Sequence, residues 1–197
     1  MLADMSRLYL AQESAADELL DSDPLALMIA MLLDQQIPLE KAFVGPYRLT
    51  ERLGVQRLDA AGIADHDPDA FREIFSTVPA IHRFPGSMAE RTQKLCQAIV
   101  SSYDGDASRI WTGAKDGKDL LKRLGDLPGF GKQKAQIFTA LLGKQFDVQP
   151  KGWREAAGLY GEKGSLRSVA DITDAVSLTK VRAYKKEMKA AAKAGSS

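Results

Sequence analysis

The sequence predicts an all-α fold. Apolar residues recur at intervals of three and four along most of the chain, which is the spacing of the buried face of a helix. A strict alternation of apolar and polar residues, typical of strands, is hard to find outside a short stretch at Leu8-Tyr9-Leu10. Prolines and glycines separate the periodic segments, most clearly at Pro85-Gly86 and Pro128-Gly129. Connections this short predict helices that pack against their sequence neighbours.

The first clear helix begins after Ser22-Asp23, where a capping side chain precedes Pro24 at the first helical position. It continues to Leu33 and is apolar on nearly all sides, so we expect it to be buried at the centre of the fold. The polar run Asp34-Gln35-Gln36 would then emerge where the core meets the surface. Further helices are expected at residues 39–53, 69–75, 87–103, 117–124, 132–142 and 176–192.

The composition is that of a globular protein, with 45% hydrophobic and 27% charged residues in 197. No long uncharged apolar run and no basic segment followed by an apolar one is present, so we expect no membrane partner and a cytoplasmic protein, nucleoid-associated if bacterial. We also expect a monomer. The single cysteine, Cys96, cannot form an internal disulfide or a four-cysteine cluster, and its place in an amphipathic segment predicts a buried thiol.

Charge is distributed unevenly along the chain. Residues 1–100 hold 9 basic and 15 acidic residues, whereas residues 101–197 hold 18 basic and 11 acidic ones. A polyanionic partner would therefore bind mainly to the second half. Part of this excess lies in the terminal helix, where a plain solvated face is the alternative interpretation; the residues are Lys180, Arg182, Lys185, Lys186, Lys189 and Lys193.

The most specific motif covers residues 124–135, which read LGDLPGFGKQKA. Leu124 and Leu127 would close a first helix onto the core and Pro128 would end it. Gly129 and Gly131 can adopt a positive φ or let a ligand approach the backbone closely. A second helix would then begin at Lys132, and its unpaired N-terminal amides would carry partial positive charge. These features predict a helix-hairpin-helix.

Such a hairpin suits a phosphate, because backbone amides bind the anion without regard to base identity. We therefore expect the hairpin to anchor double-stranded DNA without reading its sequence. The alternative is an ordinary αα-hairpin in which the glycines only permit the turn.

With these residues in place, the chain between about Pro24 and Ala157 resembles the helix-hairpin-helix DNA glycosylases with a Gly/Pro-rich loop and an aspartate (HhH-GPD), which include endonuclease III and the adenine and 8-oxoguanine glycosylases. The resemblance implies two helical lobes with a cleft between them. It divides the chain into an N-terminal segment, 1–22, that packs on the terminal lobe; a helical lobe, 23–143, with the hairpin at about 117–142; and the rest of the second lobe, 144–197, with a basic terminal helix.

The resemblance also implies DNA-contacting residues. A glutamine at the end of the buried helix enters the DNA near the lesion, which would be Gln36 with Gln35 beside it, and Phe84 occupies the position of a wedge inserted into the duplex. Core packing is the alternative for Phe84. In the hairpin, the phosphate-binding amides would be those of Gly129, Gly131 and Lys134, with Lys132 beside them. Na⁺ or K⁺ would be held by backbone carbonyls, here those of Gly125, Leu127 and Phe130.

Two positions depart from the family pattern. Bifunctional members carry a nucleophilic lysine two residues after the second hairpin glycine, where this chain has Gln133, so we expect no AP lyase activity. The catalytic aspartate of the family aligns with Gln149, which supplies no anion. Three carboxylates are candidate substitutes: Asp147, Glu155 and Asp34. The alternatives are a helix cap for Asp147, a surface partner of Lys151 or Arg154 for Glu155, and a polar group at the edge of the cleft for Asp34.

The four cysteines of an iron-sulfur cluster are missing, so no such cofactor is expected. A glycine-rich loop at 161–171 either contacts phosphate or is simply exposed. His66 and His82 are too isolated for a metal site, and the sequence leaves open whether His82 and Arg83 face DNA. We expect a monofunctional DNA N-glycosylase of base excision repair that acts on damaged bases. The alternative is a non-catalytic protein that binds DNA lesions or structures and has lost the catalytic aspartate.

Overall fold

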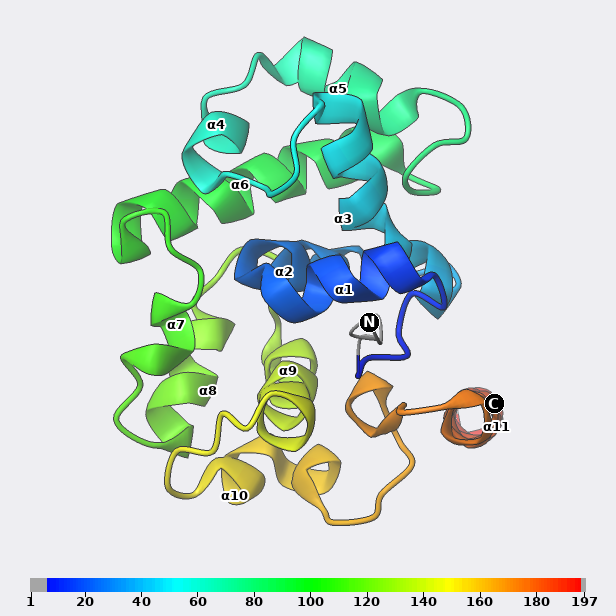
Figure 1. Ribbon diagram of the computed structural model, residues 1–197. Helices are drawn as coiled ribbons and strands as arrows, with labels where there is room; N and C mark the ends of the chain where they lie inside the picture. Colours follow the sequence, from blue (N-terminus) through cyan, green and yellow to red (C-terminus); the bar gives the residue numbers. More distant parts are fainter. Residues whose placement is uncertain (1–6, 196–197) are drawn as a thin grey trace, which may run out of the picture.

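The computed structural model describes residues 7–195, and this part of the chain contains 11 α-helices, two short 3-10 helices and no strand (Figure 1). The expected all-α class is confirmed. The α-helices are α1 (Ser14–Ser22), α2 (Pro24–Leu33), α3 (Leu39–Leu53), α4 (Ala60–Ala64), α5 (Pro68–Ser76), α6 (Pro85–Tyr103), α7 (Arg109–Thr112), α8 (Gly117–Gly125), α9 (Lys132–Gln145), α10 (Trp153–Ala157) and α11 (Ala175–Ala194). The 3-10 helices are η1 (Gly158–Gly161) and η2 (Val169–Asp171).

Every helix expected from the sequence is present, and four short ones were missed. Helices α4, α7 and α10 have 5, 4 and 5 residues, too few for a helical period to show in the sequence. The fourth, α1, follows the stretch Leu8-Tyr9-Leu10, which is not a strand. Its amides are instead held by a buried carboxylate, because the backbone N–H groups of Leu10 and Ala11 donate to Asp17 at 2.9 and 2.8 Å.

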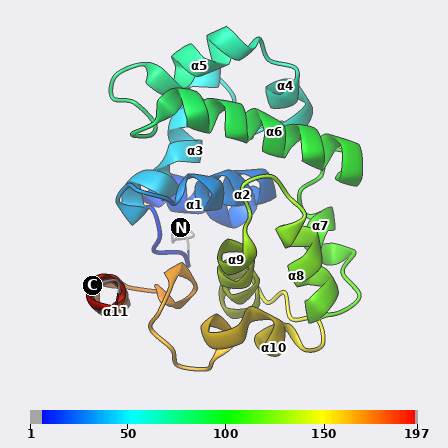
Figure 2. The same cartoon turned by 180° about the vertical axis from the view of Figure 1, so that it is seen from behind.

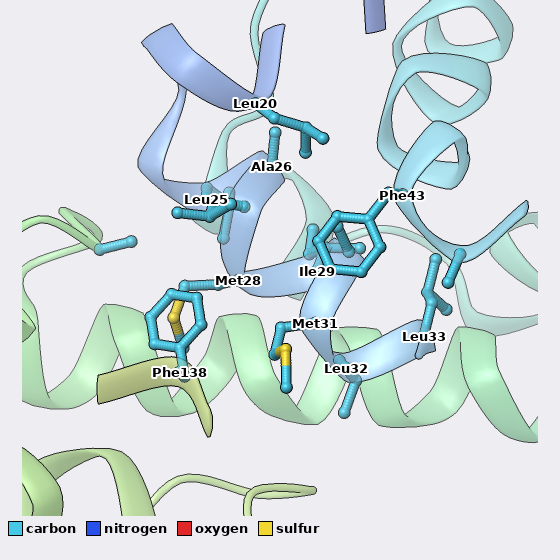
Figure 3. Close-up of a cluster of buried hydrophobic side chains, with 14 of the residues drawn as sticks. Leu20, Leu25, Ala26, Met28, Ile29, Met31, Leu32, Leu33, Phe43 and Phe138 are labelled. Carbon is cyan, nitrogen blue, oxygen red and sulfur yellow. The ribbon is translucent and has the colours of Figure 1, made fainter. Parts of the chain in front are cut away.

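Helix α2 is the centre of the fold, as its composition predicts. Its residues from Leu25 to Leu33 are all buried, and Figure 3 shows their side chains between Phe43 of α3 and Phe138 of α9. The Asp23 carboxylate caps the helix by accepting the amides of Leu25 and Ala26, and also accepts the amide of Leu58 at 2.9 Å. The cap therefore fixes the start of α2 to the segment after α3.

Two groups of helices lie on opposite sides of α2 (Figures 1 and 2). In the first group, α4 and α5 pack on α6; in the second, α8, α10, η1 and η2 pack on α9. Buried side chains from both groups belong to one continuous core. Cys96 lies in this core, as expected, and burial raises the pKa of its thiol to about 12.

Helix α11 lies at the edge of the molecule, seen end-on in Figure 1, and packs against η2. Over residues 7–195, no helix combines the length and the apolar composition needed to cross a membrane.

Candidate nucleic-acid interface

Helices α8 and α9 pack against each other and are joined by a tight turn at residues 126–131. Two backbone hydrogen bonds hold the turn: the amide of Leu127 donates to the carbonyl of Leu124, and the amide of Phe130 to that of Leu127, both at 3.1 Å. Leu124, Leu127 and Phe130 are buried. The apolar residues of the motif therefore anchor the turn to the core and leave its backbone at the surface.

The two glycines of the turn have different reasons to be glycine. Gly129 has φ +84°, and a Cβ there would lie 2.3 Å from Cδ1 of Leu32, so the fold itself excludes a side chain. Gly131 has φ −69° and ψ 172°, a conformation open to any residue, and a Cβ there would meet nothing within 4 Å. The fold does not require glycine at position 131. Close approach of an external ligand to this backbone would explain it.

The N-terminal end of α9 is exposed and electropositive. Gly131, Lys132 and Gln133 are exposed, no side chain caps the helix, and its first turn contains no acidic residue. Helices usually place acidic residues there to oppose the dipole, whereas α9 places Lys132 and Lys134 in its first turn. The charges therefore add to the positive end of the helix and create a site suited to an anion.

This end of α9 lies beside the last turn of α2. The side-chain amine of Lys134 donates to the carbonyl of Leu32 at 3.1 Å, across 102 residues of sequence. Burial lowers the pKa of Lys134 to about 8, although the negative charge of Asp34 opposes the shift. The residue's amide belongs to the exposed first turn, so its backbone and its side chain face different surroundings.

Asp34 ends α2 and is partly buried beside these cations. Burial raises the pKa of its carboxyl, and the positive charges of Lys185 and Lys134 oppose that rise. The sequence alone gave no reason to place Lys185, at the far end of the chain, near Asp34. The carboxylate thus lies between the end of α2, the start of α9 and α11.

Gln35 and Gln36, which follow Asp34, differ in their freedom. The Gln35 side-chain amide donates to the carbonyl of Leu32 at 3.2 Å and to Sδ of Met88 at 3.4 Å, so this side chain is held against the protein. Gln36 has φ +57° and an exposed side chain. Of the pair, Gln36 is the one directed into solvent.

His82 is buried and connects the glutamine pair to the segment before α6. Its Nδ1 accepts the amide of Phe84 at 3.0 Å, so the proton is on Nε2, which donates to the carbonyl of Gln35 at 3.0 Å. Burial lowers the pKa of the ring and keeps it neutral. The interpretation that His82 faces DNA is therefore wrong: a fully buried ring with both nitrogens bonded internally holds the structure together.

Phe84 has 42% of its surface exposed, directly before α6. The guanidinium of Arg83 lies over the ring, 5.3 Å from its centroid. Core packing, the alternative interpretation of this residue, does not account for so exposed a ring. The structure brings Phe84 and Gln36 to the same end of α2 through His82, while the wedge role itself stays a prediction.

The two family positions occupied by glutamine are not brought together. Gln133 is exposed, and its amide donates to the hydroxyl of Tyr160 at 2.8 Å. Gln149 donates instead to the carbonyl of Gly143 at 2.8 Å. Gly143 follows Gln133 by ten residues on α9, which corresponds to about 15 Å along the helix axis. Gln149 thus lies near the opposite end of α9 from the exposed hairpin turn.

The three candidate carboxylates also lie in different places. Asp147 has an 85% exposed side chain 4.0 Å from the guanidinium of Arg7, and it caps no helix. Glu155 is exposed on α10 and forms no ion pair with any described residue, including Lys151 and Arg154. Only Asp34, of these three, lies beside the hairpin.

Several residues near the C-terminal end of α9 were missed by sequence reasoning. The amine of Lys144 donates to Asp171 at 2.5 Å, and both side chains are largely buried. Asp171 also accepts the hydroxyl of Ser165 and the amides of Arg167 and Ser168. A sequence signal was available, because Ser168 and Asp171 have the spacing of a capping box, which the structure contains. This part of the 161–171 loop is structural.

Residues 7–195 contain no cluster of histidine, cysteine or acidic side chains suited to a metal ion. A hairpin cation would use backbone carbonyls instead, and that site, at Gly125, Leu127 and Phe130, stays a prediction.

Comparison of the chain with known protein families and with curated proteins gives no match. The interpretation of this surface therefore depends on the residues and contacts described above.

Proposed function

We propose that the protein is a DNA-binding member of the HhH-GPD class that releases damaged bases as a monofunctional DNA N-glycosylase. The observation that carries the proposal is the convergence at the end of α2. The uncapped N-terminus of α9, the exposed Gln36 and the exposed Phe84 all lie around it, linked through Leu32 and His82.

The hairpin supplies the DNA-binding part of this function. Phosphate oxygens accept hydrogen bonds from the free amides at Gly131 and in the first turn of α9, and Lys132 adds positive charge. Gln36 and Phe84 then enter the duplex, where an aromatic ring offsets the unstacking of a base, which costs a few kcal/mol. Affinity should fall steeply with salt and depend little on sequence.

Asp34 supplies the charge for bond cleavage. Breaking the N-glycosidic bond moves the bonding electrons onto the departing base and leaves positive charge on the sugar, which water then attacks at C1′. A carboxylate beside the sugar stabilises that charge. Lys134 and Lys185 favour the ionised form of Asp34 against the effect of burial. Gln133 has no amine for a Schiff base, so no strand cleavage follows.

The alternative, a non-catalytic binder of lesions or DNA structures, has an observation in its favour. Both positions that carry catalytic groups in the family hold amides, and each amide has its own internal hydrogen bond. Neither glutamine adds charge to the site, so this alternative requires that Asp34 serve only structure.

The deciding experiment incubates the protein with duplexes that carry different lesions and then adds alkali to cleave abasic sites. Asp34→Asn keeps the side-chain shape and removes the charge, and we expect base release to fall by about 100-fold to 1,000-fold with DNA binding retained. Asp147→Asn and Glu155→Gln are matched controls with wild-type rates. Wild-type protein that binds duplexes and releases no base from any lesion would favour the non-catalytic binder.

A further inference from the structure

The second half of α11 stands away from the protein. The buried residues of the helix, Ser177, Leu178 and Val181, all lie in its first half. From Lys185 to Gly195 every residue is exposed. The helix follows η2 through a short extended segment and lies beyond the other helices in both Figure 1 and Figure 2. An exposed helix of this kind gains little from packing, so its side chains are free to serve a partner.

The basic residues of α11 form a stripe on one side. At about 100° per residue, Arg182, Lys185, Lys186, Lys189 and Lys193 fall within an arc of about 100°. We call these five residues the basic stripe. Lys180 projects from nearly the opposite side, close to the single acidic residue of the helix, Glu187. The helix thus separates its own charges into a cationic side and a mixed side.

The basic stripe begins at the candidate nucleic-acid interface. Arg182 forms an ion pair at 2.8 Å with Glu40, in the first turn of α3. Lys185 lies near enough to Asp34 to favour its ionised form. Both contacts fix the start of the stripe beside the segment that carries Gln36, so the stripe continues the same electropositive surface outward.

The arrangement works against the isolated helix. Residues four apart on a helix are neighbours, and Lys185 and Lys189 form such a pair of like charges, as do Arg182 and Lys186. Among the described residues, neither Lys186 nor Lys189 has an acidic partner. A polyanion along the stripe would neutralise this repulsion.

We propose that α11 is a second DNA-contacting arm, whose basic stripe follows the phosphates of the duplex that flanks the hairpin-bound segment. The proposal rests on the DNA-binding part of the proposed function. A helix of 20 residues is about 30 Å long, which matches about nine base pairs. The opposite side of α11 carries mainly alanine with Lys180 and Glu187, and therefore lacks the large apolar face that a membrane surface requires.

The test compares lysines on two sides of one helix in the full chain. Fluorescence anisotropy measures binding to labelled duplexes of about 25 and about 10 base pairs over a series of salt concentrations. The double variant Lys186→Gln, Lys189→Gln should bind the long duplex about 10-fold to 100-fold more weakly, with a salt slope smaller by about 2. On the short duplex, which the hairpin alone covers, its affinity should equal that of the wild type.

Matched variants separate position from charge. Lys189→Gln should weaken binding to the long duplex by several fold, whereas Lys180→Gln, the same change on the opposite side, should not. The double variant Lys186→Arg, Lys189→Arg keeps the charge and should bind as the wild type. Equal losses for Lys180→Gln and Lys189→Gln, or no loss for either, would overturn the arm. Circular dichroism checks that α11 stays helical.

The outcomes also distinguish this proposal from the one on which it rests. If Gly131→Val leaves short-duplex binding intact while the stripe variants still lose affinity, the hairpin fails and the arm stands. If the hairpin variant loses binding and the stripe variants do not, the arm fails alone. Failure of the wild type to bind either duplex overturns both. Capture of the stripe by an acidic protein in place of DNA would show itself as that third outcome.

Discussion

The two ends of α9 have opposite characters. At the N-terminal end, the first-turn amides are uncapped, basic residues replace the usual acidic ones, and Gly131 is glycine without a need from the fold. At the C-terminal end, polar groups are satisfied internally: Gln145 donates to three backbone carbonyls, and Asp171 accepts Lys144 within a buried network.

The contrast separates function from structure on a single helix. A network that satisfies its own hydrogen bonds stabilises the fold and offers little to a ligand, whereas an end that violates the usual capping and charge preferences is stable only with a partner. Gln149, placed at the catalytic position by sequence register, lies at the satisfied end. Asp34, which the sequence treated as one of three substitutes, lies at the unsatisfied end.

The largest effect is expected at the satisfied end. Asp171→Ala leaves the amine of Lys144 buried without its carboxylate and removes the acceptor of two backbone amides, so the free energy of unfolding should fall by about 3–5 kcal/mol. Urea denaturation measures the change. Glu162→Gln, which breaks an exposed ion pair with Arg167 in the same loop, is the control and should cost less than about 1 kcal/mol.

At the other end, the two turn glycines should separate stability from binding. Gly129→Val combines a positive φ with a clash against Leu32 and should lower the free energy of unfolding by about 2–4 kcal/mol. Gly131→Val should change it by less than about 1 kcal/mol and weaken duplex binding by about 10-fold, because its side chain covers the amides. Thermal denaturation and anisotropy measure the two effects. Gly131→Val with unchanged affinity in a folded protein would remove the hairpin from the interface.

Local signals made much of the fold predictable, and long-range contacts did not. The buried helix α2 follows from Asp23-Pro24 and a continuous apolar run, and the α8–α9 turn follows from its proline and glycines, because these depend on neighbouring residues. The pairing of Lys134 with Leu32 spans 102 residues and leaves no periodic trace in the sequence. The role of His82 was missed for the same reason, since its partners lie 47 and 49 residues away.

The pH dependence of stability tests whether Lys134 is as buried as its contact with Leu32 indicates. Its pKa in the folded protein is about 8, below the ordinary 10.5, so between these values the unfolded chain binds more protons and stability from this group rises with pH. The rise should be at most about 1.4 kcal/mol per pH unit and should disappear in Lys134→Met. Urea denaturation at pH 7.5, 8.5 and 9.5 for both proteins isolates the difference. Parallel pH profiles would show that the amine is solvated.

The smallest effect is expected at Gln149, where the sequence placed the lost catalytic group. Aspartate at this position is too short and has no N–H to donate to the carbonyl of Gly143, so Gln149→Asp should cost about 0.5–1.5 kcal/mol of stability. It should add no base release, because its carboxylate would lie near the C-terminal end of α9, remote from the hairpin turn. Gln149→Ala removes the same hydrogen bond without adding charge and should match it. A gain of activity in Gln149→Asp alone would move the reacting sugar to the satisfied end and reverse the contrast between the two ends.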